Sequence, residues 1–375
     1  CAAVFNNGAI CIQGITAGLG GSCVASNTAF GVCSLFGNTT GSLNASYGFC
    51  NMCCNQTGAC NVSSGACALF CNTGGSVNTA LGFQSMYCNT SGACNVAVGG
   101  CSLFTNNSGS CNVAVGFKSL VKNTSGVCNV AVGAETLIEN TSGCCNIVLG
   151  VCTMPANTSG CNNIALGFFA ACNSTTACGN IAVGTCTLFN NCVNGGNIAL
   201  GTCALFTSTS GCCNLAVGSN AMAGLTTGCT NIAIGCLAMG TGATTGCDNI
   251  AVGYQTQLNL TCGCQNVSIG DSSAMCLTSG CFNTTLGHLS GCCISSGLCN
   301  TGIGYRSLLC TNTGIDNTAV GADSLCDLSS GCWNTGVGCG AGSSLTTGCA
   351  NTLTGWASGA SLACLLYTSP SPRDQ

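Results

Sequence analysis

The chain has 375 residues, of which 47% are hydrophobic and only 3% are charged, and its formal net charge is −4. Ordinary soluble proteins carry about 25% charged residues. The only basic side chains are those of Lys118, Lys122, Arg306 and Arg373, which are too few to neutralise a nucleic-acid backbone or an anionic membrane surface. No apolar run approaches the roughly 20 residues of a membrane-spanning helix. We therefore expect no nucleic-acid partner and no membrane span.

Cysteine is the residue type that most indicates the compartment. The chain has 42 cysteines, a content that suits an oxidising environment far better than a reducing cytosol. We therefore expect a secreted, extracellular protein. The chain opens at Cys1 in the middle of a repeat-like pattern, which predicts a mature or truncated piece of a longer protein.

A repeat of seventeen residues organises almost the whole chain. Twenty units begin with Asn, and each has Gly four residues later; a single extra residue precedes the unit that begins at Asn249. The twenty asparagines are Asn27, Asn44, Asn61, Asn78, Asn95, Asn112, Asn129, Asn146, Asn163, Asn180, Asn197, Asn214, Asn231, Asn249, Asn266, Asn283, Asn300, Asn317, Asn334 and Asn351. Positions within a unit are counted below from this Asn as position 1.

Each unit contains the pattern of a short strand followed by a turn. Positions 2 and 4 are mostly β-branched or aliphatic with a small residue between them, which predicts a strand whose position 2 points inward together with position 4. Position 9 is Leu or Met in fourteen of twenty units, which predicts a second short strand. The Gly at position 5 marks a turn or a close backbone approach, as at Gly99, Gly116, Gly133 and Gly150.

A unit this short cannot bury its own apolar side, but copies stacked on one another can. A helical repeat is excluded because the unit is too short for a helix pair and is rich in Gly and β-branched residues. The prediction is an all-β fold: a parallel β-solenoid, or β-roll, of about 20 rungs that forms one domain over residues 1–364. At a strand spacing of roughly 4.8 Å, twenty rungs would extend about 95 Å. Residues 365–375 break the pattern and are expected to be a non-native tail.

The consensus N-(T/V/I)-A-(V/I/L)-G-x-x-(A/S)-L-x-x-N-T-(S/T)-G-x-x resembles the repeats in the shafts of phage and bacterial tail-fibre proteins. It is more distantly similar to the head repeats of trimeric autotransporter adhesins. The resemblance covers about residues 10–364, and it implies a parallel β-roll, three chains about one axis, and a role as an elongated adhesin or spacer. The cysteine content differs from these families and favours a cysteine-rich secreted variant.

The cysteines recur at fixed positions of the unit, here called columns. Residues of one column lie one rung apart, within the Cα separation of about 4.4–6.8 Å that a disulfide tolerates. We therefore predict disulfides that stabilise a narrow core, while the alternative is that Cys acts as a small buried apolar residue. The candidates are Cys94, Cys111, Cys128 and Cys145 at position 17, and Cys144, Cys161, Cys178, Cys212, Cys229, Cys247, Cys264 and Cys281 at position 16.

Thirteen Asn-x-Ser/Thr sequons provide candidate glycosylation sites. Those on the predicted turns are expected to carry glycans that would solubilise a nearly uncharged surface; the alternative is that Asn-Thr-Ser is simply turn chemistry. The turn candidates are Asn38, Asn55, Asn89, Asn106, Asn123, Asn140 and Asn157.

The sequence offers no catalytic or cofactor chemistry. One His, unpaired acids and the absence of a P-loop Lys leave no expected base, nucleophile or phosphate site, so we expect neither an enzyme nor a cofactor. The C-x-x-C of Cys50–Cys54 lacks the second matching pair of a zinc site, so no metal is expected either. Three functions stay open: a structural filament made by self-association, an adhesive fibre with a cell-surface or carbohydrate ligand, and an ice-binding solenoid.

Overall fold

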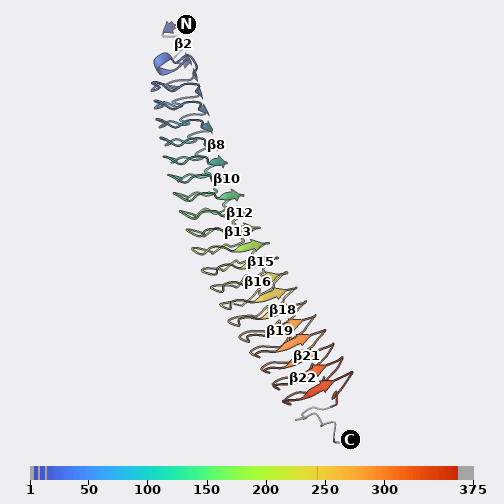
Figure 1. Ribbon diagram of the computed structural model, residues 1–375. Helices are drawn as coiled ribbons and strands as arrows, with labels where there is room; N and C mark the ends of the chain where they lie inside the picture. The colour runs from blue at the N-terminus through green and yellow to red at the C-terminus, as the bar shows by residue number, and fades with distance from the viewer. Residues whose placement is uncertain (1–3, 7–8, 13–14, 243, 362–375) are drawn as a thin grey trace, which may run out of the picture. The chain divides into compact units, whose positions relative to one another are not determined.

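The computed structural model describes residues 4–6, 9–12, 15–242 and 244–361, and these form an all-β parallel solenoid with seventeen residues in most turns (Figure 1). This confirms the predicted fold class. Among the described residues the only helical segment is the 3₁₀ turn η1, Gly21–Cys23. Contacts divide the chain into two compact units, unit 1 over Cys1–Val183 and unit 2 over Gly184–Gln375. A single domain over residues 1–364 stays a prediction, and residues 365–375 lie outside the described part.

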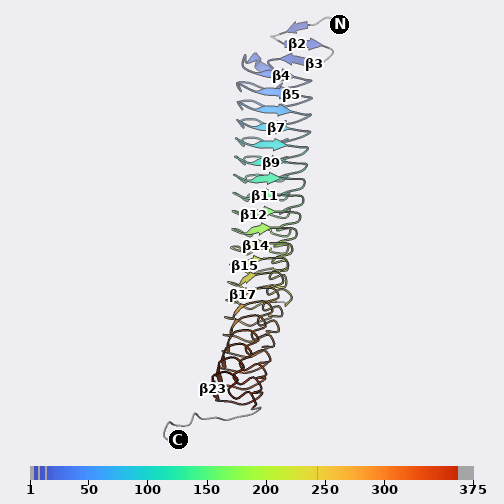
Figure 2. The same cartoon turned by 90° about the vertical axis from the view of Figure 1, so that its right-hand side faces the viewer.

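Unit 1 starts with three antiparallel strands, β1 Val4–Asn6, β2 Ala9–Ile12 and β3 Ile15–Gly18, and β3 pairs antiparallel with β4. The solenoid rungs therefore begin at β4 rather than near residue 10. From β4 onward the strands are parallel and in register, one per rung (Figure 2). They are β4 Thr28–Phe30, β5 Ala45–Tyr47, β6 Val62–Ser64, β7 Thr79–Leu81, β8 Val96–Val98, β9 Val113–Val115, β10 Val130–Val132, β11 Ile147–Leu149, β12 Ile164–Leu166 and β13 Ile181–Val183.

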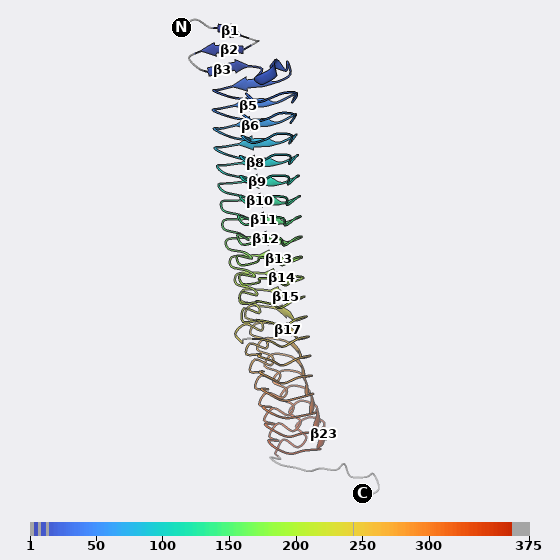
Figure 3. The ribbon, with the colours of Figure 1, turned by 90° about the vertical axis from the view of Figure 1, so that its left-hand side faces the viewer.

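Unit 2 repeats the same rung, again with parallel in-register strands (Figure 3). The extra residue before Asn249 leaves the strand register intact, since Ile232 still pairs with Ile250. The turn between the two strands therefore absorbs the insertion. The strands are β14 Ile198–Leu200, β15 Leu215–Val217, β16 Ile232–Ile234, β17 Ile250–Val252, β18 Val267–Ile269, β19 Thr284–Leu286, β20 Thr301–Ile303, β21 Thr318–Val320, β22 Thr335–Val337 and β23 Thr352–Thr354.

The interior of a rung is small and partly polar. In the rung that starts at Asn112, the buried side chains are those of Asn112, Ala114, Ser119, Leu120 and Asn123, all 0% exposed. The Leu or Met at position 9 is therefore the main apolar contribution of each such rung. Because so little can be buried within one rung, stability depends on contacts between rungs, as expected for a solenoid.

The prediction of a second strand around position 9 is wrong, because positions 6–11 form a turn. The backbone at positions 7 and 9 of this turn has the positive φ of the left-handed region. Lys118 and Leu120 both have φ of 53°. The N–H of Lys118 donates to the Gly100 carbonyl at 3.0 Å, and that of Leu120 donates to the Thr136 carbonyl at 2.9 Å. The turn thus bonds to the rungs on both sides. Left-handed residues also let positions 8 and 9 both face inward, which the alternation of a strand would not allow.

The position-5 glycines occupy backbone that other residues rarely adopt. Gly116 has φ of 132°, and a Cβ atom there would overlap the carbonyl oxygen of Gly133 in the next rung. Both the torsion and the close approach therefore require glycine. The same holds at Gly99 and Gly150, whose φ values are 127° and 135°.

The backbone at position 17 is also in the left-handed region, so one substitution there is expected to stabilise the fold. Val77 has φ of 60° and an exposed side chain, whereas Asn162 occupies the same column with φ of 58°. Asn tolerates this region and a β-branched residue does not. We expect Val77→Asn to raise the free energy of unfolding by about 1 kcal/mol, measured by urea denaturation. Val98→Asn, in strand β8, is the control and should give no gain; an equal gain at both sites would contradict this explanation.

Candidate functional surfaces

The side chains of the strands face the opposite way from the prediction. In every one of the twenty parallel strands described, the middle residue is buried and both flanking residues are partly or fully exposed, as in β9 and β11. The expectation that positions 2 and 4 point inward is therefore wrong. Position 3 instead faces positions 8 and 9 across the interior: a Cβ on Gly302 would lie 3.1 Å from Ser307 Oγ and 3.4 Å from Leu308 Cδ1. Position 3 is a small residue in most strands, although Val148 is fully buried there in β11.

The outward side chains at positions 2 and 4 form a surface that we call the strand face, one in each unit. Neither position carries a charged residue in any of the twenty strands. In register, Val130 lies between Val113 and Ile147, and Ile147 is 43% exposed. From β8 to β13, and again from β14 to β18, both positions hold only Val, Ile or Leu. Contiguous exposed apolar surface of this kind is typical of protein, membrane or ligand contact sites.

The strand face changes composition at the end of unit 2. From β19 to β23, position 2 is Thr in every strand, and the threonines are paired in register along the sheet. They are partly or fully exposed. The outward column is Thr284, Thr301, Thr318, Thr335 and Thr352.

The cysteine columns lie on the outer surface and in half-buried turn positions. The disulfides predicted from the sequence stay a prediction. At position 17 all four candidates are exposed: Cys94, Cys111, Cys128 and Cys145. At position 16 Cys178 is exposed, and seven candidates are partly buried: Cys144, Cys161, Cys212, Cys229, Cys247, Cys264 and Cys281.

The candidate glycosylation column is buried. These asparagines occupy position 12 and are at most 2% exposed, and each amide bonds to at least one neighbouring rung. Asn123 Nδ2 donates to Asn106 Oδ1 at 2.7 Å and to the Gly126 carbonyl at 3.0 Å, and Asn140 Nδ2 donates to Asn123 Oδ1 at 2.8 Å. A glycan on Nδ2 would have to break this ladder. Glycosylation of this column stays a prediction, and its residues are Asn38, Asn55, Asn89, Asn106, Asn123, Asn140 and Asn157.

Aromatic rings at position 10 stack along unit 1. Phe70 and Tyr87 lie 5.1 Å apart between ring centroids, and Tyr87 and Phe104 lie 5.2 Å apart, with the rings within 6° of parallel. Burial of the phenol raises the pKa of Tyr87. This stack follows from the seventeen-residue spacing and supports contacts between rungs.

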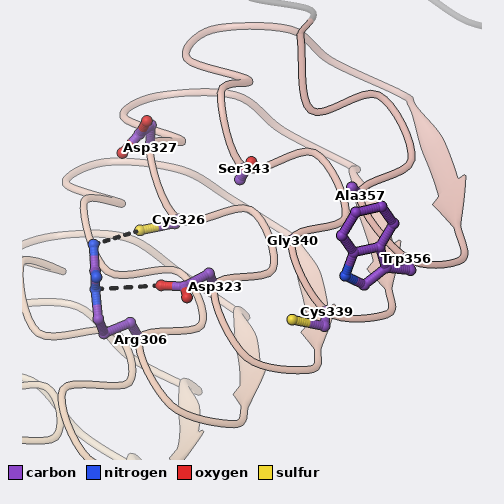
Figure 4. Close-up of a pocket in the computed structure, with 9 residues that line it drawn as sticks. All are labelled: Arg306, Asp323, Cys326, Asp327, Cys339, Gly340, Ser343, Trp356 and Ala357. Carbon is purple, nitrogen blue, oxygen red and sulfur yellow. Dashed lines mark hydrogen bonds and ion pairs between the residues drawn. The ribbon is translucent and has the colours of Figure 1, made fainter.

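Several of the few charged side chains meet at a pocket of about 360 Å³ in unit 2 (Figure 4). Arg306 Nε lies 3.3 Å from Asp323 Oδ1, and its Nη2 donates to Cys326 Sγ at 3.7 Å. Burial raises the pKa of the Cys326 thiol to about 11, against a lowering effect of Arg306. Trp356, 83% exposed, lies on the opposite side of the pocket. The sequence analysis did not identify this group, although Arg306 and Asp323 are one repeat apart.

Metal-binding clusters and membrane helices are both absent from the described residues. Within 4–6, 9–12, 15–242 and 244–361, no three His, Cys, Asp or Glu side chains are arranged to hold a metal ion. Among those same residues no helix has the length and apolar character to cross a bilayer.

Comparisons with known proteins found no matching family model, no similar curated protein and no similar solved structure. The parallel solenoid with its seventeen-residue spacing is compatible with a repeat shaft. Membership in the tail-fibre or autotransporter families stays a prediction that rests on the repeat motif.

Proposed function

We propose that this protein is a structural subunit of an extracellular fibre, in which copies of the chain associate through the strand face. The observation that supports this proposal is the uncharged aliphatic surface of β8–β13 and β14–β18. Removing such surface from water is favourable by roughly 25 cal/mol per Å² of apolar area. A neighbouring chain with the same surface is the partner that matches it in composition.

The repeat favours open-ended assembly over a closed dimer. Because each rung presents nearly the same side chains as the next, a second chain shifted by one rung meets an equivalent surface. An interface that does not return to its starting point generates a filament rather than a closed oligomer. A bundle of three chains about one axis, as the resemblance implies, is one arrangement that would cover the strand face.

The extracellular setting is proposed from the cysteine content. Forty-two thiols in one chain suit an oxidising compartment, where disulfides within or between chains form and persist. The low charge is consistent with a protein that works in the assembled state, since a large net charge opposes close association.

The test compares two triple variants with the same added charge. Val113→Lys, Val130→Lys and Ile147→Lys place three cations on the strand face, and Ser108→Lys, Ser125→Lys and Ser142→Lys place three on an exposed turn of the same region. We expect filaments of wild type and of the turn variant by negative-stain microscopy. The strand-face variant should remain monomeric in light scattering, because a lysine cannot be desolvated cheaply.

Two results would contradict the proposal. If the strand-face variant forms the same filaments, the strand face is not the interface. If the wild type remains a dispersed monomer at all concentrations, the protein is not a filament subunit.

Ice binding is a second candidate, and it is supported by the outward Thr column of β19–β23. A flat, regular array of hydroxyl and methyl groups is suited to ordering water, and the outward orientation of position 2 places these groups on the surface. The test is a thermal-hysteresis assay of wild type, Thr318→Lys on the strand face, and Thr313→Lys on an exposed turn. Activity lost only in Thr318→Lys would support ice binding, and absence of activity in the wild type would exclude it.

A further inference from the structure

We propose that Cys144 pairs with Cys161, and Cys212 with Cys229, as disulfides that link successive rungs within one chain. The sequence predicted only that these columns contain disulfides, without connectivity. The structure distinguishes these two pairs from their neighbours in the same column, and the inference does not depend on fibre formation.

The first pair lies in unit 1. Cys144 Sγ donates to Cys161 Sγ at 2.9 Å, and the backbone N–H of Cys144 donates to the same sulfur at 3.2 Å. Both hydrogen bonds run from Cys144 to the sulfur of Cys161 in the next rung, and they place the two sulfurs side by side. The hydrogen bond to Cys161, together with burial, raises the pKa of Cys144 to about 12.

The second pair, in unit 2, repeats this geometry in a different rung. Cys212 Sγ donates to Cys229 Sγ at 2.7 Å, and the Cys212 N–H donates to Cys229 Sγ at 3.3 Å. The hydrogen bond to Cys229, together with burial, raises the pKa of Cys212 to about 12. The arrangement thus occurs at the start of two separate runs of the column, whereas in the pair Cys332 and Cys349 the Cys332 thiol donates to the Ser330 carbonyl of its own rung.

Other thiols in the column point elsewhere. Cys178 Sγ also accepts a backbone N–H, from Cys161 at 3.1 Å, but its own S–H donates to the Thr176 carbonyl within its rung at 3.5 Å. Cys247 and Cys264 behave in the same way, donating to the carbonyls of Thr245 and Cys262. A sulfur directed at its own rung is not placed to bond the next one. In the two runs that start at Cys144 and Cys212, only this first cysteine directs its S–H at the sulfur of the next rung.

The reaction needs an oxidant, and oxidised glutathione supplies it. The thiolate is the nucleophilic form of a cysteine. The Cys161 thiolate attacks one sulfur of oxidised glutathione, which forms a mixed disulfide and releases one glutathione thiolate. The Cys144 thiolate then attacks Cys161 Sγ and releases the second glutathione. Two protein thiols are oxidised, one glutathione disulfide is reduced to two thiols, and the two protons pass to the released glutathiones.

The experiment is peptide mapping of the full chain. Reduced protein is equilibrated with a mixture of oxidised and reduced glutathione, free thiols are alkylated, and the digest is analysed by mass spectrometry without reduction. Cys145→Ser and Cys213→Ser remove the adjacent thiols, so that each linkage is assigned to one sulfur. We expect a linked peptide pair that contains Cys144 and Cys161, and another that contains Cys212 and Cys229, each lost on reduction.

Two further variants make the assignment specific. Cys161→Ser should abolish the first linkage completely and leave Cys144 alkylated, whereas Cys178→Ser, the matched control in the same column, should leave it intact. Circular dichroism checks that each variant keeps its β structure. Recovery of Cys144 as an alkylated thiol in oxidised wild type, or its linkage to any cysteine other than Cys161, would overturn the proposal. Neither result bears on the proposed fibre, which negative-stain microscopy tests separately.

Discussion

Replacing Gly133 by alanine is expected to lower the free energy of unfolding by at least about 3 kcal/mol, because two separate effects add. Gly133 has φ of 131°, a backbone region open essentially to glycine, and a Cβ there would overlap the Gly150 carbonyl oxygen. The neighbouring rung is fixed by in-register pairing between Val132 and Leu149, so it cannot move away without breaking the sheet. Urea denaturation followed by circular dichroism measures the change.

The chain provides a matched control for this substitution. Gly100 has no left-handed torsion, and the nearest atom that a Cβ would meet is Phe117 Cδ2 at 3.5 Å, an ordinary contact. Gly100→Ala should therefore be neutral or stabilise the fold by about 0.4–1 kcal/mol, through the unfolded state. Equal effects of the two substitutions would show that neither the torsion nor the close approach limits position 5.

Replacing Asn123 by aspartate is expected to destabilise the fold by about 3–5 kcal/mol at neutral pH, the cost of an uncompensated buried charge. Asn123 is fully buried. Its amide protons go to Asn106 Oδ1 and the Gly126 carbonyl, and both acceptors would then face a carboxylate. Asn107→Asp, at an exposed site in the preceding rung, is the control and should change stability by less than about 0.5 kcal/mol.

The stability lost in Asn123→Asp should depend on pH in a defined direction. Burial and facing acceptors raise the pKa of the introduced carboxyl in the folded state above its unfolded value of about 3.9. The folded state then binds the proton more tightly than the unfolded state does. Stability is therefore greatest below about pH 4 and falls as the pH rises through the folded-state pKa. Denaturation midpoints that show no extra pH dependence relative to wild type would contradict a buried ladder.

The Asn ladder has an apolar counterpart in unit 2, where the same column contains Leu260 and Leu277, both fully buried. A hydroxyl residue can stand beside a leucine in this column, since Thr244 Oγ1 donates to the Leu260 carbonyl at 2.9 Å. An asparagine at position 12 gains from amide partners in the neighbouring rungs, because an unmatched polar group there leaves a buried donor or acceptor unsatisfied.

The sequence by itself determined the period, the parallel stacking and the site of the tight glycine. These follow from local spacing, since seventeen residues recur with Gly116 and Gly133 in equivalent places and no single unit can bury its own surface. In-register pairing then follows because a shift would misalign every column at once.

Only the tertiary structure decided which side of the strand faces in. Val130, Ala131 and Val132 are all apolar, so alternation identifies two faces without saying which is the interior. The inward turn decides: positions 8 and 9, such as Ser119 and Leu120, fill the interior, and the middle strand residue, such as Ala131, lies on the same side. The same limit applies to Asn123, whose local sequence is that of an exposed turn. Its burial depends on amide partners that exist only when rungs are stacked, and no local pattern contains that information.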